Sequence, residues 1–261
     1  MKLTTHLFAT LLFFVGLLTV QAAVKDDGLI LYFSFDNENG GKIEDKTGGG
    51  NDAEIINKAE ITTGEKKFGK GALEIRDANA DVQVQSFKEL VDYQDNSYLF
   101  WINFIEAHNG AWSQIIAKKA PGSDRSPGIW ICPNSLNIHW RFNPGNQGTG
   151  CAGPDGENTL FETKKWYHVA GIKEDGTLTF YVDGEKLQEY PVPAKHAQGA
   201  EQLYIGKTGY RAATFYIDEL YVYDRALDEK EIASVMEGDL LPVEPQEKLT
   251  TTWGKMKTRR D

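Results

Sequence analysis

The fold is decided by a stretch near the C-terminal end of the chain, Phe215-Tyr-Ile-Asp-Glu-Leu-Tyr-Val-Tyr-Asp-Arg-Ala-Leu227. Its first part is mostly aromatic and aliphatic, which is the composition of a β-strand. Successive side chains of a strand alternate between two faces, and both faces here are mostly apolar. We therefore expect a central strand covered on both sides, with Asp218 on the face of Leu220 and Val222 and Glu219 on the opposite face.

The residues after this strand predict a short helix. Asp228 is suited to cap the helix, and Glu231 stands three residues further on, as a capping box requires. Gly238 is a suitable C-terminal stop. Strand, turn and capped helix thus follow from local chemistry alone.

The composition indicates a packed, acidic β protein. The 261 residues are 41% hydrophobic and include 26 Gly and 9 Pro, which is typical of a chain with a core and many turns. The net charge of −10 argues against nucleic acid or an anionic membrane as the main partner. Cations and neutral ligands suit such a domain better.

The N-terminus predicts export. Residues 1–22 resemble a signal peptide, with Lys2 before an apolar run from Leu7 to Val20 and small residues at the cleavage point. This run is shorter than the roughly 20 residues that span a bilayer, although a retained anchor is the alternative. We expect a secreted, periplasmic or cell-surface protein with no membrane span after signal removal.

Export also affects the two cysteines, Cys132 and Cys151. An oxidising compartment favours a disulfide between them. A loop of this length would stabilise the fold by roughly 3 kcal/mol in the chain-entropy model.

Strand and turn signals recur along residues 24–238 without a long linker, which predicts a single β-sandwich. The clearest hairpin signal is Asp183-Gly184 between two apolar strands. Residues 239–261 contain two prolines and a basic cluster. We interpret them as a solvated linker and tail, and docking to a protein partner is the alternative.

Several motifs resemble laminin-G-like domains of the concanavalin A-like lectin/glucanase jelly-roll family. They follow one another in the family's order: GLILYFSFD (28–36), GGGND (48–52), FGKGALEI (68–75), WYHVAGIKEDGTLTFYVDGEK (166–186) and YIDELYVYDRAL (216–227). The resemblance implies an all-β fold, a two-sheet antiparallel jelly-roll β-sandwich with one short C-terminal helix. It also implies an extracellular binding role, most often for glycans, and often a structural calcium ion.

Calcium is the best-motivated cofactor. It takes six to eight oxygen ligands, and Asp36 and Asp218 both lie on apolar strands where a shared cation would compensate their charge. The resemblance carries a calcium role to these two residues and, more loosely, to Asn51. The alternative is that each carboxylate accepts hydrogen bonds from turn amides.

Catalysis is not expected. Glycoside hydrolases need two carboxylates flanking the glycosidic bond, and on this fold these typically form a Glu-x-Asp-x-Glu strand, which the sequence lacks. Asp218 and Glu219 are adjacent and are expected on opposite faces. We expect His168 to have a structural role, and His139 and His196 stand in no catalytic motif.

A sugar-binding site would use exposed aromatic faces, because sugars present an apolar C–H face. Trp112, Trp130 and Trp140 are the candidates because they lie beside long predicted loops, although most tryptophans of a sandwich are in the core. We therefore predict a non-catalytic module that binds a glycan or a surface or matrix glycoprotein. A structural or adaptor role in the cell envelope or matrix is the alternative, and a diverged glycoside hydrolase is a third.

Overall fold

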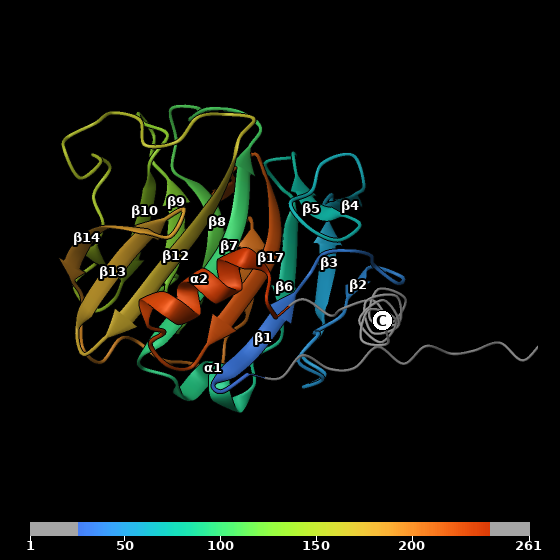
Figure 1. The fold of residues 1–261 in the computed structure, drawn as a ribbon, viewed down its shortest axis with the longest axis horizontal. Helices are drawn as coiled ribbons and strands as arrows, with labels where there is room; N and C mark the ends of the chain where they lie inside the picture. The colour runs from blue at the N-terminus through green and yellow to red at the C-terminus, as the bar shows by residue number, and fades with distance from the viewer. Residues whose placement is uncertain (1–25, 241–261) are drawn as a thin grey trace, which may run out of the picture.

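A computed structural model describes residues 26–240 as two β-sheets packed face to face. Figure 1 shows the sheets as two layers, with helix α2 lying on the outer side of one of them. One large apolar cluster fills the space between the layers. The predicted jelly-roll sandwich is therefore confirmed.

One sheet has eight strands, all in antiparallel pairs, and contains the first and the last strand of the domain. β1 (Leu29–Phe33) pairs with β17 beside the main path, whose order is β14 (Glu185–Pro191), β13 (Thr177–Val182), β12 (Trp166–Glu174), β7 (Asn96–Phe104), β17 (Phe215–Tyr223), β5 (Ala72–Ile75) and β4 (Glu60–Thr62).

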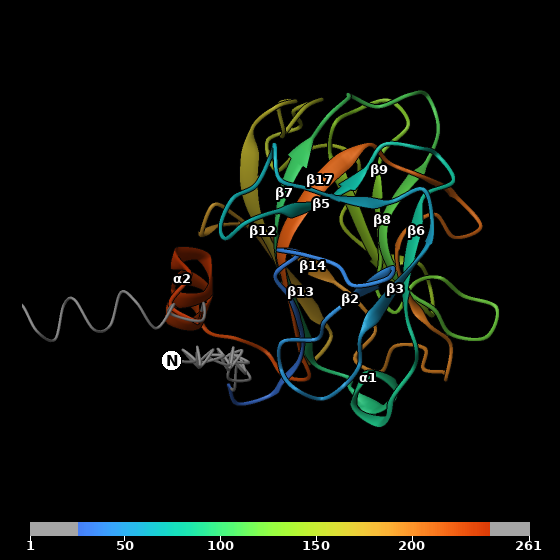
Figure 2. The same cartoon turned by 90° about the vertical axis from the view of Figure 1, so that its right-hand side faces the viewer.

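The other sheet has nine strands, and neither helix within residues 26–240 lies on its outer side (Figure 2). The short β16 (Arg211–Ala212) pairs parallel with β8, and the antiparallel path runs through β11 (Gln147–Gly148), β10 (Ile138–Phe142), β9 (Gly128–Ile131), β8 (Ser113–Lys118), β15 (Leu203–Gly206), β6 (Asp81–Val84), β3 (Ala53–Asn57) and β2 (Lys42–Ile43).

Strand β17 is central, as predicted, but its alternation is broken by a β-bulge. Glu219 has a φ of 52°, and the pairing with β7 shifts between Asp218 and Tyr221. The extra residue changes the phase of the strand: Ile217 and Leu220 both face the inter-sheet core. Asp218 and Glu219 both lie on the outer side. The expectation that Asp218 shares a face with Leu220, and that the two carboxylates oppose each other, is wrong.

The bulge lies where β17 changes its partner on one edge. Residues before it pair with β5, ending at Ile217, and residues after it pair with β1, starting at Leu220. Between these two partners the edge of β17 has no strand beside it. The carboxylates of Asp218 and Glu219 therefore stand at a gap in the sheet, which the surrounding loops fill.

The predicted helix is confirmed as α2 (Glu229–Glu237). The Asp228 side chain accepts hydrogen bonds from the first turn, Glu231 completes the capping box, and Gly238 ends the helix in the left-handed conformation. The helix lies on the outer side of the eight-stranded sheet (Figure 2), and its apolar residues Ile232 and Val235 pack in a cluster with outward-facing residues of that sheet. A second short helix, α1 (Lys88–Asp92), was not predicted.

The predicted hairpin turns are also confirmed. Asp183 and Gly184, which join β13 to β14, both have positive φ values, as the turn that matches strand twist requires. Neither helix within residues 26–240 has the length and apolarity that a bilayer crossing requires. The predicted signal peptide and almost all of the predicted tail lie outside the described residues.

Candidate functional site

Two of the predicted calcium ligands, Asp36 and Asp218, lie near each other at the gap beside β17. The expectation that Asp36 is on a strand is wrong, because β1 ends at Phe33 and Asp36 stands in the bend that follows. Both carboxylates accept hydrogen bonds from the loop at residues 67–70. Asp218 Oδ2 accepts from the backbone N–H groups of Lys67 (2.8 Å) and Phe68 (3.1 Å), and the backbone N–H of Lys70 donates to Asp36. One loop thus places its amide dipoles on both carboxylates, which is the turn-amide alternative considered above.

These hydrogen bonds do not fully offset the burial of Asp218, which has no exposed surface. Burial and, to a smaller extent, the nearby Asp36 carboxylate raise the pKa of Asp218 to about 7, against the opposing effect of three backbone N–H donors. Asp36 is partly exposed. The pair is therefore electrostatically unfavourable when both groups are ionised.

Glu219 is compensated separately, on the outer face. Its carboxylate accepts hydrogen bonds from the hydroxyls of Tyr32 (2.6 Å) and Tyr221 (3.2 Å), whose rings stack at 4.3 Å. Burial, and then the charge of Asp218, raise the pKa of Glu219 well above its ordinary value. Two buried acids on one side of the sheet thus influence each other.

Asn51, the looser calcium candidate, contacts a different group. Its backbone N–H donates to Asp45 Oδ2 at 3.3 Å. Asp45 is buried and also accepts from the backbone and hydroxyl of Thr47. The glycine-rich turn therefore folds around Asp45, a residue that the sequence reading passed over.

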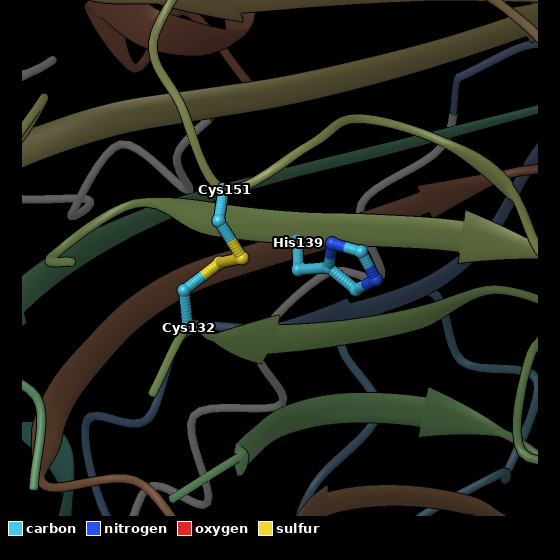
Figure 3. A group of neighbouring side chains, drawn as sticks. All are labelled: Cys132, His139 and Cys151. Atoms are coloured by element: carbon cyan, nitrogen blue, oxygen red, sulfur yellow. A yellow bond between two sulfur atoms is a disulfide. The ribbon is translucent and has the colours of Figure 1, made fainter. Parts of the chain in front are cut away.

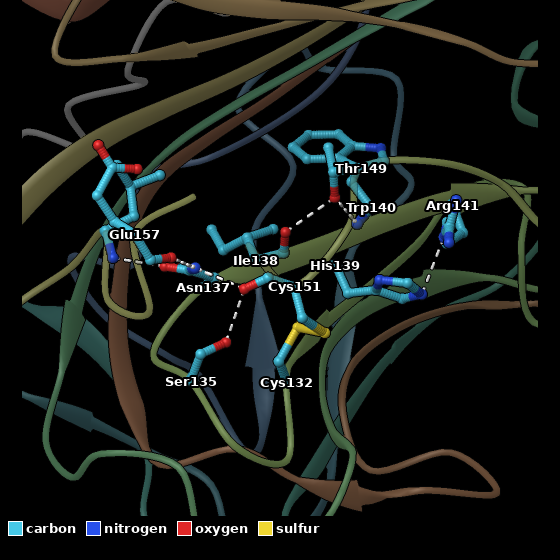
Figure 4. Close-up of a disulfide and its surroundings, with 11 residues drawn as sticks. Cys132, Ser135, Asn137, Ile138, His139, Trp140, Arg141, Thr149, Cys151 and Glu157 are labelled. Atoms are coloured by element: carbon cyan, nitrogen blue, oxygen red, sulfur yellow. Dashed lines mark hydrogen bonds between the residues drawn. A yellow bond between two sulfur atoms is a disulfide. The ribbon is translucent and has the colours of Figure 1, made fainter. Parts of the chain in front are cut away.

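The disulfide between Cys132 and Cys151 is confirmed, with the Cα atoms 5.8 Å apart. It joins the end of β9 to the long loop after β11. Ser135 Oγ and Asn137 Nδ2 both donate hydrogen bonds to the Cys151 carbonyl (Figure 4). The disulfide and these hydrogen bonds therefore hold the loop against the nine-stranded sheet.

His139 lies beside this disulfide (Figure 3). Its nitrogen and the two sulfurs are within 4.8 Å of one another, and they form the only three-residue group of metal-ligand type among residues 26–240. The sulfurs are bonded to each other, so they are not available as thiolate ligands. Metal binding is not the role of this group while the disulfide is intact.

The three candidate tryptophans occupy different places. Trp140 is fully buried between the sheets, where it packs against Phe100 and Phe180. Its expected role at a binding surface is wrong, because it stands inside the core. Trp130 is 1% exposed, on the outer face of β9. Trp112, just before β8, is the one that keeps a partly exposed ring.

Trp112 belongs to a cluster on the outer face of the nine-stranded sheet. Its ring centroid lies 4.6 Å from that of His139, which lies 6.1 Å from that of Trp130. The guanidinium of Arg125 stacks over Trp130 at 4.8 Å. Arg141 Nε donates to His139 Nε2 at 2.9 Å (Figure 4). We call these five residues the Trp112 cluster.

The strands position this cluster in a simple way. Ile138 and Trp140 of β10 face the inter-sheet core, so the alternate residues His139 and Arg141 face outward. Gly128 gives Trp130 its room, because a Cβ there would lie 2.1 Å from the Trp130 ring. The indole therefore lies flat along β9.

The electrostatics of the cluster keep His139 neutral. Burial, and then the guanidiniums of Arg141 and Arg125, lower the pKa of His139 to about 3. A neutral imidazole can accept the Arg141 hydrogen bond at Nε2. Sequence reasoning set His139 aside and missed both arginines, although the alternation of β10 carries a signal for Arg141.

Two more of the five histidines are buried, and His168 thereby fits the structural role predicted for it. His168 and His196 are buried, and burial lowers the pKa of each to about 3.

The family model for the concanavalin A-like lectin/glucanases superfamily matches residues 76–233. The chain belongs to this superfamily. This lectin/glucanase-like domain has the fold of several solved structures, all below 25% identity, so these show the fold alone. No curated protein sequence matches it.

Three similar structures show the range of proteins with this superfamily fold. The binding domain of Paraclostridial Mosquitocidal Protein 1 has a TM-score of 0.60 at 14% identity, covering 80% of this chain and 52% of that one. The botulinum neurotoxin serotype D binding domain has a TM-score of 0.59 at 17% identity, covering 82% of this chain and 53% of that one. Trypanosoma rangeli sialidase in complex with sialic acid has a TM-score of 0.60 at 20% identity, covering 85% of this chain and 35% of that one. The superfamily domain thus spans about half of each toxin binding domain and about a third of the sialidase.

Proposed function

We propose that this protein is an exported, non-catalytic carbohydrate-binding module that holds a glycan at Trp112. The observation that carries the proposal is the partly exposed Trp112, held beside His139 on a sheet face that neither helix of residues 26–240 covers. A flat aromatic ring suits the apolar C–H face of a sugar. The superfamily and its binding-domain neighbours support the same class of function.

Within residues 26–240, the only carboxylate that contacts the Trp112 cluster through an ion pair or hydrogen bond is that of Asp124, which pairs with Arg125 at 2.6 Å. A hydrolase needs a second carboxylate within about 10 Å that flanks the same bond. Binding without turnover therefore fits these residues better than catalysis.

The test is a glycan array followed by titration calorimetry with the best ligands. Trp112→Ala should abolish binding without changing the thermal midpoint by more than a few degrees. Trp166→Ala is the matched control, because Trp166 is also partly exposed but lies on the other sheet, beside Tyr216. Equal loss in both variants, or hydrolysis of labelled polysaccharides, would contradict the proposal.

We also propose a structural calcium ion between Asp36 and Asp218. The support is their mutual repulsion at the gap beside β17, which a divalent cation would relieve. Two carboxylates are fewer than the six to eight oxygens that calcium takes, so carbonyls and water would supply the rest. Asn51 is not part of this proposal, because its backbone contact is with Asp45.

The calcium proposal is tested by thermal unfolding in calcium and in chelator. Calcium should raise the midpoint of the wild-type protein and have no effect on Asp218→Asn. Identical midpoints in the two conditions for the wild-type protein would refute it.

A further inference from the structure

We propose that the glycan held at Trp112 is acidic, and that its carboxylate or sulfate group forms an ion pair with Arg141. This inference rests on the proposed function and names the ligand class of the same surface. It is carried by the charge balance and hydrogen bonding around Arg141.

The guanidinium of Arg141 is oriented by two neutral acceptors. Its Nε donates to His139 Nε2 and its Nη1 donates to the Gly148 carbonyl, both at 2.9 Å. Within residues 26–240 it forms no ion pair, and its Nη2 donates no hydrogen bond. The side chain is therefore fixed in place while part of its planar donor edge stays available.

The cluster carries positive charge that its own residues do not neutralise. Arg125 is paired with Asp124, which leaves Arg141 without a carboxylate. Burial, and then the charge of Arg125, lower the pKa of Arg141, which shows that its half-buried charge is unfavourable. Because a guanidinium keeps its proton in proteins, an anionic ligand is the natural compensation.

Trp112 and Arg141 both contact the side chain of His139. The Trp112 ring packs on the His139 ring at 4.6 Å, and Arg141 donates to its Nε2. Only His139 therefore separates the indole, on which a sugar would stack, from a planar donor that suits a carboxylate or sulfate. His139 stays neutral, so it does not compete for the anion.

The acidic chain as a whole argues for a single anionic sugar rather than a polyanion. The net charge of −10 repels nucleic acid and long sulfated chains at a distance. Attraction is then confined to the Trp112 cluster. The structure thus favours recognition of one charged residue within a glycan.

The experiment compares matched oligosaccharides by titration calorimetry. The probes carry a terminal sialic acid, a terminal glucuronic acid or a sulfated galactose, each against its uncharged parent. We expect the wild-type protein to prefer at least one acidic probe by roughly tenfold or more, and the three arms separate carboxylate from sulfate. Arg141→Gln should remove that preference, and Arg141→Lys should retain part of it.

Arg76→Gln is the matched control, because Arg76 also lies near an aromatic ring, that of Tyr216, but on the other sheet. It should leave the preference unchanged. If Arg141→Gln fails to fold, the wild-type comparison of acidic and neutral probes still decides. Equal affinity for acidic and neutral probes overturns this inference but not the proposal of a glycan-binding module. The absence of binding to any glycan overturns both the inference and that proposal.

Discussion

The hydroxyl of Tyr32 donates a 2.6 Å hydrogen bond to the carboxylate of Glu219, which joins the first and last strands of the domain across 187 residues. Both groups are buried under helix α2, and Tyr221 donates to the same oxygen. A buried carboxylate is tolerated when it is hydrogen-bonded. This contact therefore joins the first strand to the last and also stabilises the buried carboxylate of Glu219.

Tyr32→Phe should lower the free energy of unfolding by about 1–3 kcal/mol, because Glu219 loses one of its two donors in a buried site. Urea denaturation at neutral pH measures the loss. Tyr190→Phe is the control, since Tyr190 donates to Gln188 at an exposed edge and should cost less than about 0.5 kcal/mol. Equal effects of the two substitutions would disprove the special role of the buried bond.

Asp218→Asn should change how stability depends on pH. Burial raises the pKa of Asp218 to about 7 in the folded state, whereas the unfolded value is about 4. A raised carboxylate pKa favours the folded state below about pH 4, and this contribution is lost as the pH rises to about 7. The difference in free energy of unfolding between the wild-type protein and Asp218→Asn should therefore fall by about 4 kcal/mol between pH 4 and 8.

This difference is measured by urea unfolding in chelator, so that calcium does not stabilise the ionised form. The buried histidines act in the opposite direction, since their lowered pKa values weaken the fold as the pH falls below about 6.5. They are common to both proteins and cancel in the comparison. Parallel pH curves would contradict the raised pKa of Asp218.

The double variant Cys132→Ser/Cys151→Ser should have a free energy of unfolding about 3 kcal/mol below that of the wild-type protein, because the disulfide closes a loop with a sequence separation of 19. The wild-type protein treated with a thiol reductant should unfold at the same urea concentration as the variant. Midpoints unchanged from the oxidised wild-type protein would show that the bridge adds no stability.

Gly171→Ala should destabilise the domain by about 1–3 kcal/mol through overpacking. Gly171 of β12 faces Trp140 across the core, and a Cβ there would lie 2.5 Å from the indole ring. Gly209→Ala is the control, because a Cβ at Gly209 meets nothing within 4 Å. Thermal unfolding of the two variants should separate them, and similar midpoints would argue against close packing at Trp140.

Features governed by neighbouring residues were readable from the sequence. The Asp228 cap, the Glu231 capping box and the Asp183-Gly184 turn formed as predicted, because each depends on backbone geometry within a few residues. The disulfide followed from the number of cysteines and the predicted export. The sandwich followed from the order of strand and turn signals.

Features that depend on how distant strands meet were not readable. Simple alternation placed Asp218 on the wrong face, because the bulge at Glu219 arises where β17 exchanges β5 for β1. No residue pattern within β17 indicates this change of pairing partner. Alternation likewise could not say that Trp140 points into the core.

Short-range chemistry and the period of a strand were enough to specify the sandwich, its capped helix, its hairpin turns and its disulfide. Only the folded chain shows that Trp112 and Arg141 both contact His139, and that one loop donates hydrogen bonds to both Asp36 and Asp218. The reason is physical: side chains from separate strands become neighbours only through the register and stacking of the two sheets.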